Sequence, residues 1–413
     1  MAVAEPSRRG TPADAIDGVT PQRVAEPADA AACAAVLAAA AGGRQATVIR
    51  GGGTKTGWGR PVDAVDLVVS TRGLGTLLVH RDGDLTATVG AGVPLSRLNT
   101  TLAARGQWLP VDSPFEGTTV GGMLATNDSG PLRHRFGTPR DLLIGITLAL
   151  TDGRVVKSGG TVVKNVAGYD LGKLVTGSYG ALAAIVDATF KLLPLPHASA
   201  TLRAVYADPV ALAADAAALA SGQLEPLAFD VRVTDTPDGL RGMLLVRFAS
   251  SPAAVATQID AARALLGGET TALRDGMESR AWAEQVALPW EGDPSTPLGA
   301  SGAVMRCSWM PSRLGDVLAL VASLSTGCDV ALAGRVATGA GLLRITGPDA
   351  AIAAAVVRAR LAESPVGHVV LLRASRALRA QVDVWGAAPS APAAALKRAL
   401  DPMGILNAGR GPV

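Results

Sequence analysis

Short apolar runs alternate with glycine-rich turns through the first third of the chain. An alanine-rich run ends at Gly42-Gly43, and glycine is a stop signal of helices. A second run starts with Pro94 and ends before Gly106, and a proline start and a glycine stop are typical of a helix. Runs rich in β-branched residues between them have the length of strands. The elements predicted in this order are a helix at 28–41, strands at 46–49, 66–70 and 85–89, and a helix at 94–105.

A long polar stretch, residues 110–140, follows and is rich in glycine, threonine, asparagine and proline. A structureless stretch of this length inside a compact domain is usually functional or disordered. Apolar runs at 142–150, 154–156 and 181–193 then predict buried strands, and the prolines at 194 and 196 mark an expected domain boundary.

The second half of the chain mixes strands with alanine-rich helices and predicts a second α+β domain. Its strands are expected at 228–233 and 243–248, and its helices at 209–220, 253–266, 314–323 and 351–361, before a last helix at 391–400. The overall fold class is therefore α+β. The pattern divides the chain into a flexible tail at 1–20, a first domain at 21–196, a second at 197–390 and a C-terminal segment at 391–413.

Composition and charge exclude several classes of function for this chain. The formal net charge of the 413 residues is only +3, and no Lys/Arg cluster is interleaved with aromatics, so we expect no nucleic-acid partner. Apolar runs are too short to span a bilayer, and the N-terminus lacks the apolar core of a secretory signal. Three dispersed cysteines and four scattered histidines predict no disulfide, zinc, iron–sulfur or other metal site, and a cytoplasmic location is expected.

The loop at 50–57, RGGGTKTG, is a candidate phosphate cradle. Three consecutive glycines allow positive φ angles and let backbone N–H groups approach an anion closely, while Thr54, Lys55 and Thr56 add hydroxyls and a charge. The alternative is a simple turn. A Walker loop is excluded because Leu174 follows Gly172-Lys173, and the dinucleotide fingerprint fails after Gly90-Ala91-Gly92.

A second glycine-rich segment, residues 117–123, also offers small residues and hydroxyls, and Asn127 and Gly130 follow it. Two such loops could hold the two phosphates of a dinucleotide from opposite sides. The alternative is an Ω-loop without a ligand.

Five segments in order resemble the FAD-binding fold of the vanillyl-alcohol oxidase / p-cresol methylhydroxylase superfamily, and within it the smaller FAD-binding subunits of bacterial glycolate oxidases. The segments are RGGGTKTGWGRP (50–61), VPLSRLNTTLAARGQWLP (93–110), TTVGGMLATNDSGPLRHRFGTPRDLLIG (118–145), GGTVVKNVAGYDLGKLVTGSYGALAAIVDATFKLLPLP (159–196) and DPMGILNAGR (401–410). This resemblance implies that the first domain is a two-subdomain FAD-binding fold of the p-cresol methylhydroxylase type, and that the second is an α+β cap.

The resemblance also implies the residues that bind FAD. The loop Arg50–Thr56 would bind the cofactor, with Gly51–Lys55 at the diphosphate and a second set of residues on its other side. The backbone at Ile185-Val186 would face the adenine, and Asn407 would return to the flavin region. The full set is Arg50, Gly51, Gly52, Gly53, Thr54, Lys55, Thr56, Thr119, Gly121, Gly122, Asn127, Gly130, Ile185, Val186 and Asn407.

Three departures from the family pattern qualify the expected activity. Relatives with covalent flavin often have a histidine where this chain has Thr54, so FAD is expected to be non-covalent. The metal-binding signature of relatives that oxidise 2-hydroxy acids is missing. Where such relatives tend to place an arginine and a threonine, this chain has Val163 and Ala167, and valine cannot clamp a carboxylate. No catalytic residue is therefore predicted.

The implied function is that of an FAD-binding subunit in a glycolate-type, 2-hydroxy-acid oxidoreductase complex that transfers electrons through its flavin. A second flavoprotein subunit that oxidises the acid and an iron–sulfur subunit are the expected partners, and they could hold the chain at the inner face of the membrane. Two alternatives are a stand-alone FAD-dependent dehydrogenase of another substrate and a scaffold that has lost its flavin.

Overall fold

The chain divides into two compact units, which are described separately. A computed structural model describes residues 7–161, 168–236, 239–290, 302–347, 355, 367–407 and 409–412. The first unit comprises Met1–Ser129, Phe136–Leu195 and Ala387–Val413, and the second comprises Gly130–Arg135 and Pro196–Gly386. Among the described residues, no helix is long and apolar enough to cross a membrane.

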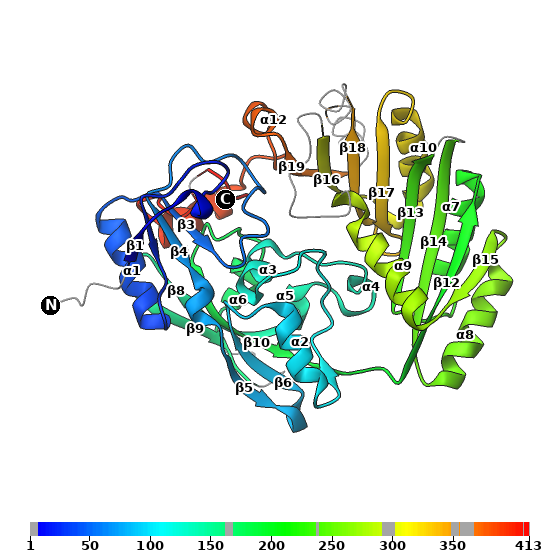
Figure 1. The fold of residues 1–413 in the computed structure, drawn as a ribbon, viewed down its shortest axis with the longest axis horizontal. Coiled ribbons are helices and arrows are strands. Elements are labelled where there is room, and N and C mark those ends of the chain that lie inside the picture. Colours follow the sequence, from blue (N-terminus) through cyan, green and yellow to red (C-terminus); the bar gives the residue numbers. More distant parts are fainter. Residues whose placement is uncertain are drawn as a thin grey trace. The chain divides into compact units, whose positions relative to one another are not determined.

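A small sheet begins the first unit and leads into the glycine loop (Figure 1). Its strand order is β1-β2-β4-β3, and β4 runs parallel to both β2 and β3. The helix α1 starts where the Asp29 carboxylate accepts a hydrogen bond from the Ala32 N–H, and its buried face joins the unit's core. The bounds are β1 Ser7–Arg9, β2 Arg23–Ala25, α1 Ala30–Gly42, β3 Thr47–Arg50 and β4 Leu67–Ser70.

A five-stranded antiparallel sheet forms the rest of the unit, with the order β5-β6-β10-β8-β9. Its central strand, β10, is buried along most of its length, with Asp187 half-buried and only Lys191, at its end, exposed. The strands are β5 Leu77–Arg81, β6 Thr86–Gly90, β8 Leu143–Ala149, β9 Val155–Gly159 and β10 Ala184–Lys191, and β7 Gln107–Trp108 pairs with β11 Leu193–Pro194. The longer helices are α2 Leu95–Ala103 and α13 Ala391–Leu400, and the shorter ones are α3 Val120–Thr126, α5 Pro139–Leu142 and α6 Leu171–Val175.

The prediction of a flexible tail at residues 1–20 is wrong for residues 7–20. β1 forms an antiparallel pair with β2, and the side chain of Ile16 is completely buried. The carboxylate of Asp14 accepts hydrogen bonds from Arg8 and from Arg50, which lies next to the glycine loop. The composition of residues 1–20 did not predict this structure, because the structure depends on contacts with β2 and Arg50.

The stretch 110–140 is not structureless, since it contains α3, α4 (Arg133–Phe136) and α5. Thr119 caps α3 by accepting a hydrogen bond from the N–H of Gly122, and Thr138 begins α5 with a capping box that includes Asp141. These helices have four to seven residues, so they are too short to produce a helical hydrophobic period. Residues 130–135 also belong to the second unit, where Arg135 pairs with Glu225.

The second unit is built on an eight-stranded antiparallel sheet with the order β15-β12-β14-β13-β17-β18-β16-β19. The helices α7, α8 and α10 cover one face, and α9 lies on the other (Figure 1). The strands are β12 Ala198–Tyr206, β13 Ala228–Thr236, β14 Gly239–Ser250, β15 Glu269–Leu273, β16 Gly302–Ser308, β17 Asp329–Arg335, β18 Ala340–Thr346 and β19 His368–Ala374. The helices are α7 Pro209–Ala220, α8 Pro252–Leu265, α9 Asp275–Ala287, α10 Leu314–Leu324 and α12 Arg376–Gln381. The helix predicted at 351–361 lies outside the described residues, except for residue 355.

Asp14 should contribute to stability in a pH-dependent way. Hydrogen bonds from Arg8 and Arg50 hold the pKa of this carboxyl well below its ordinary value. Its contribution is therefore present above the unfolded pKa of about 4 and declines as the pH falls below that value. We expect Asp14→Asn to lower the free energy of unfolding by about 2 kcal/mol at pH 7, because Arg8 and the largely buried Arg50 lose their charged hydrogen-bond partner.

Urea unfolding at pH 7, 5, 4 and 3 measures this effect, with Asp84→Asn as the control because Asp84 is an exposed aspartate. The difference between wild type and Asp14→Asn should shrink towards pH 3. A difference that stays constant across the pH range would contradict the assigned ion pair.

Candidate functional site

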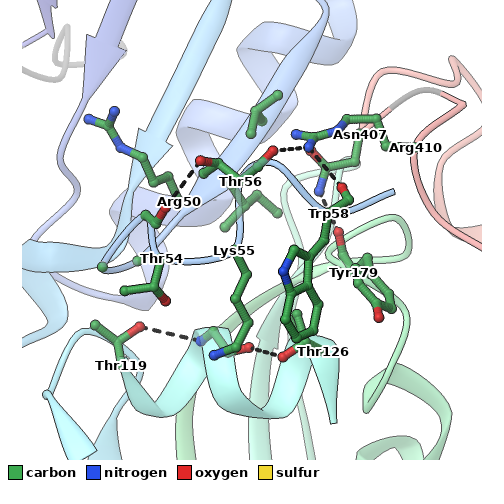
Figure 2. Close-up of a pocket in the computed structure, with 17 residues that line it drawn as sticks. Arg50, Thr54, Lys55, Thr56, Trp58, Thr119, Thr126, Tyr179, Asn407 and Arg410 are labelled. Atoms are coloured by element: carbon green, nitrogen blue, oxygen red, sulfur yellow. Dashed lines mark hydrogen bonds between the residues drawn. The ribbon is translucent and has the colours of Figure 1, made fainter. Parts of the chain in front are cut away.

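A pocket in the first unit collects the glycine loop and residues from three distant segments (Figure 2). Its empty space, which includes space open to solvent, is about 630 Å³. The lining residues are Val48, Ile49, Arg50, Gly51, Gly52, Gly53, Thr54, Lys55, Thr56, Trp58, Thr119, Gly122, Ala125, Thr126, Tyr179, Asn407 and Arg410.

The glycine loop leaves the carboxyl end of β3 and lies directly against the segment before α3. A Cβ atom on Gly51 would be 2.1 Å from the Thr119 hydroxyl, and one on Gly52 would be 1.9 Å from the Gly117 carbonyl oxygen. Gly53 has a φ of +80°, a conformation that side chains disfavour. Each glycine is therefore required for a separate steric reason.

Four consecutive backbone donors of this loop are available to a ligand. The N–H groups of Gly52, Gly53, Thr54 and Lys55 have no hydrogen-bond partner among the described residues. Successive free amides on a concave loop form an anion-binding nest. The loop can therefore bind phosphate oxygens through its backbone.

The second glycine-rich segment packs against the loop at 50–57, and the backbone N–H groups in the first turn of its helix already have hydrogen-bond partners. In the first turn of α3, the N–H of Val120 donates to the Val93 carbonyl at 2.9 Å, and that of Gly121 donates to the Ala91 carbonyl at 2.8 Å. The N–H of Gly122 donates to the Thr119 hydroxyl at 3.3 Å. This segment therefore supplies the surface on which the first loop rests, and no free first-turn amides.

The ammonium group of Lys55 is engaged within the protein. It lies 3.2 Å from a carboxylate oxygen of Asp128 and donates to the Thr118 hydroxyl at 3.2 Å. It also lies 4.9 Å from the ring centroid of Phe115, and its side chain is 6% exposed. Lys55 thus anchors the loop, and its backbone N–H is the group that remains for a ligand.

Arg50 is likewise held in place, by the N-terminal segment. Its guanidinium donates to the Asp14 carboxylate at 2.9 Å and to the Asp14 backbone carbonyl at 3.1 Å. This pair fixes the side chain at the start of the loop.

The C-terminal segment closes the pocket from the other side. Thr47 in β3 donates its N–H to the Ile405 carbonyl, and Asn407 returns its own N–H to Thr47, so the chain end extends the sheet beside β3. The Asn407 amide donates to the Tyr179 carbonyl, and both residues have positive φ angles of +44° and +56°. Non-glycine residues in this strained conformation concentrate at functional sites.

The carbonyl oxygen of the Asn407 side chain is buried and has no partner among the described residues. Asn407 is 7% exposed and lines the pocket. A buried acceptor without a donor is costly, so a ligand N–H or O–H would stabilise it. The pocket therefore offers donors at the glycine loop and an acceptor at Asn407.

Most of the sequence-predicted residues come together in this pocket. The ones that line it are Arg50, Gly51, Gly52, Gly53, Thr54, Lys55, Thr56, Thr119, Gly122 and Asn407.

Five predicted residues do not line the pocket. Gly121 packs against Ala91, where a Cβ would be 2.8 Å from the alanine methyl, and Asn127 ends α3 with a φ of +48°. Gly130 belongs to the second unit. Ile185 and Val186 are buried in β10, and the Val186 carbonyl accepts a hydrogen bond from Ala91.

Sequence reasoning missed four polar or aromatic lining residues, namely Trp58, Thr126, Tyr179 and Arg410. All four fall inside the motifs at 50–61, 118–145, 159–196 and 401–410, which was the only available signal. Val163 and Ala167, which replace the substrate-binding pair of relatives, lie outside the described residues. Across the described residues, no group of three or more His, Cys, Asp or Glu could hold a metal ion.

Comparisons with known proteins agree with this geometry. Residues 21–159 match the family described as FAD binding domain. The glycolate oxidase subunit GlcE of Escherichia coli is 36% identical over 231 residues, which are 54% of this chain and 61% of that protein. A D-lactate dehydrogenase of Archaeoglobus fulgidus is 38% identical over 146 residues, which cover 35% and 33% of the two chains.

The glycolate oxidase subunit GlcD of Bacillus subtilis is 32% identical over 184 residues, which are 44% of this chain and 39% of that protein. The chain therefore spans less than two thirds of the length of these relatives. A solved structure of alkyldihydroxyacetonephosphate synthase matches 94% of this chain and 76% of its own, with a TM-score of 0.69 and 16% identity. That likeness shows the fold alone.

Residues 21–159 of the chain thus form an FAD-binding domain, and FAD is its cofactor. Parts of the chain are similar to the glycolate oxidase subunits GlcE and GlcD and to a D-lactate dehydrogenase.

We expect Gly52→Ala to abolish stable FAD binding. Its Cβ would lie 1.9 Å from a backbone carbonyl oxygen, so the loop must move and its free amides would no longer converge. Gly57→Ala is the matched control, because a Cβ there meets nothing within 4 Å. Visible absorbance of the purified proteins, relative to their protein content, measures flavin occupancy. Equal occupancy in the two variants would show that the close approach is unimportant.

Proposed function

We propose that this chain binds FAD non-covalently and serves as an FAD-binding subunit of a complex that oxidises a small 2-hydroxy acid. The observation that carries the proposal is the pocket itself, which is lined by Gly52–Lys55, whose four N–H groups have no partner among the described residues, and by Asn407 with its unpartnered buried acceptor. The similarity to GlcE and GlcD, both named as glycolate oxidase subunits, supports the substrate class.

Each part of the pocket has a distinct task in this proposal. The loop amides bind the diphosphate, and the ion pairs of Arg50 and Lys55 hold the loop in the conformation that presents them. Asn407 accepts a hydrogen bond from a polar group of the cofactor. Bound FAD supplies the redox chemistry by accepting a hydride and passing its electrons onwards.

We infer two partners, a second flavoprotein subunit and an iron–sulfur subunit. Iron–sulfur clusters are held mainly by clustered cysteine thiolates, while the three cysteines of this sequence lie far apart, so we place a relay of this kind in another chain. Val163 stands where acid-oxidising relatives tend to have an arginine, which favours the second flavoprotein as the place of acid oxidation. In this arrangement the chain is cytoplasmic and is held at the inner face of the membrane through its partners.

Non-covalent attachment predicts complete release of flavin on denaturation. Thr54 occupies the position after the three loop glycines, and its hydroxyl cannot form the stable link that a histidine would. After treatment with SDS and separation by electrophoresis, no flavin fluorescence should remain with the protein band. Fluorescence that migrates with the chain would overturn the proposed mode of attachment.

The complex can be tested by affinity purification of the chain with its neighbours, followed by flavin and iron analysis. We expect iron only in the complex, and turnover of glycolate or D-lactate with an artificial electron acceptor in the complex but not in the isolated chain. Strong turnover by the isolated chain would replace this proposal with a stand-alone dehydrogenase. A colourless chain that takes up no added FAD would indicate a scaffold.

A further inference from the structure

Arg410, three residues after Asn407, contacts the far end of the glycine loop. Its Nε donates to the Arg60 carbonyl at 3.2 Å, and one terminal nitrogen donates to the Trp58 carbonyl at 3.0 Å and to the Thr56 carbonyl. One side chain thus spans alternate carbonyls of the loop, more than 340 positions away in the sequence (Figure 2). It is 6% exposed and also lines the pocket.

The backbone that carries Arg410 is itself rigidly held. Lys397 on α13 donates to the Asp401 carboxylate at 2.6 Å and to the carbonyls of Ala181 and Leu406 at 2.8 and 2.9 Å. The same carboxylate accepts the N–H groups of Ile405 and Leu406. Arg410 therefore projects towards the loop from a fixed platform.

We propose that Arg410 is a positioning residue for FAD, acting through the loop that binds the diphosphate. The loop needs such a brace because the N–H groups of Gly52, Gly53, Thr54 and Lys55 have no partner among the described residues and so do not themselves hold its conformation. Free amides bind an anion well only when they already converge, since ordering a loose loop on binding costs affinity. The Arg410 bonds draw the carbonyls of Thr56, Trp58 and Arg60 onto one guanidinium and so fix the loop's last turn.

The inference deepens the FAD site of the proposed function. It assigns a role to Arg410, whose side chain donates hydrogen bonds to backbone carbonyls of the protein. An arginine suits this role because its planar fork presents several donors in fixed directions, whereas a lysine has a single flexible nitrogen. Removing groups that orient ligand-binding residues typically weakens binding about ten- to a hundredfold, as for the outer partners of metal ligands.

FAD affinity is therefore measured by fluorescence quenching on flavin-depleted full-length protein at two salt concentrations. We expect Arg410→Ala to raise the Kd for FAD about ten- to a hundredfold. Arg410→Lys should recover only part of this affinity. For each variant, the ratio of its Kd to the wild-type Kd should be the same at both salt concentrations. ADP, which carries the diphosphate without the flavin, should lose affinity by a similar factor. Arg398→Ala is the matched control, because Arg398 is exposed on α13 in the same segment, and it should bind FAD like wild type.

Hydrogen exchange of the flavin-depleted proteins supplies a second readout, in which residues 50–60 should exchange faster in both Arg410 variants than in the control. If Arg410→Ala does not fold, Arg410→Lys carries both measurements. Wild-type affinity in Arg410→Ala, or full rescue by Arg410→Lys, would overturn the positioning role, the latter by showing that charge suffices. Failure of the wild-type chain itself to bind FAD would instead overturn the proposed function.

Discussion

The direct contact between two glycine-rich segments is the constraint on which the site depends. Gly51 and Gly52 lie against Thr119 and Gly117 with no space for a side chain on either glycine. This contact brings the end of β3 onto the start of α3, and the loop and α3 line one pocket. Because the contact is steric, it requires glycine at both positions, whatever ligand the pocket accepts.

Several long-range polar contacts hold the loop in this conformation. Asp14 fixes Arg50 at its start, Asp128 fixes Lys55 in its middle, and Arg410 holds the carbonyls at its end. The charged side chains of Arg50 and Lys55 are thus engaged within the protein, whereas the N–H groups of Gly52, Gly53, Thr54 and Lys55 have no partner among the described residues. Successive amides of this kind can form an anion-binding nest.

The local pattern predicted several helices closely but few strands of the second unit. The helices predicted at 209–220 and 391–400 coincide with α7 and α13, where alanine-rich runs follow the N-caps Asp208 and Ser390, and the helix predicted at 314–323 ends one residue before α10. Of the eight strands in the second unit's sheet, only β13 and β14 were predicted. The pairing of β1 with β2 depends on a partner elsewhere in the sequence, and the four-residue helices within 110–140 are too short to leave a periodic signal.

The sequence by itself predicted the α+β class and, through its ordered motifs, the cofactor class, and it singled out the loop at 50–57 as a candidate phosphate-binding loop. Only the tertiary structure decided which groups of the motifs are engaged within the protein and which residues line the pocket. It turned the Lys55 ammonium to Asp128, buried Gly121 and Val186 in packing contacts, and brought Tyr179, Asn407 and Arg410 to the loop. Residue types specify what a group can bind, but its direction and its competing partners are set by segments hundreds of positions away.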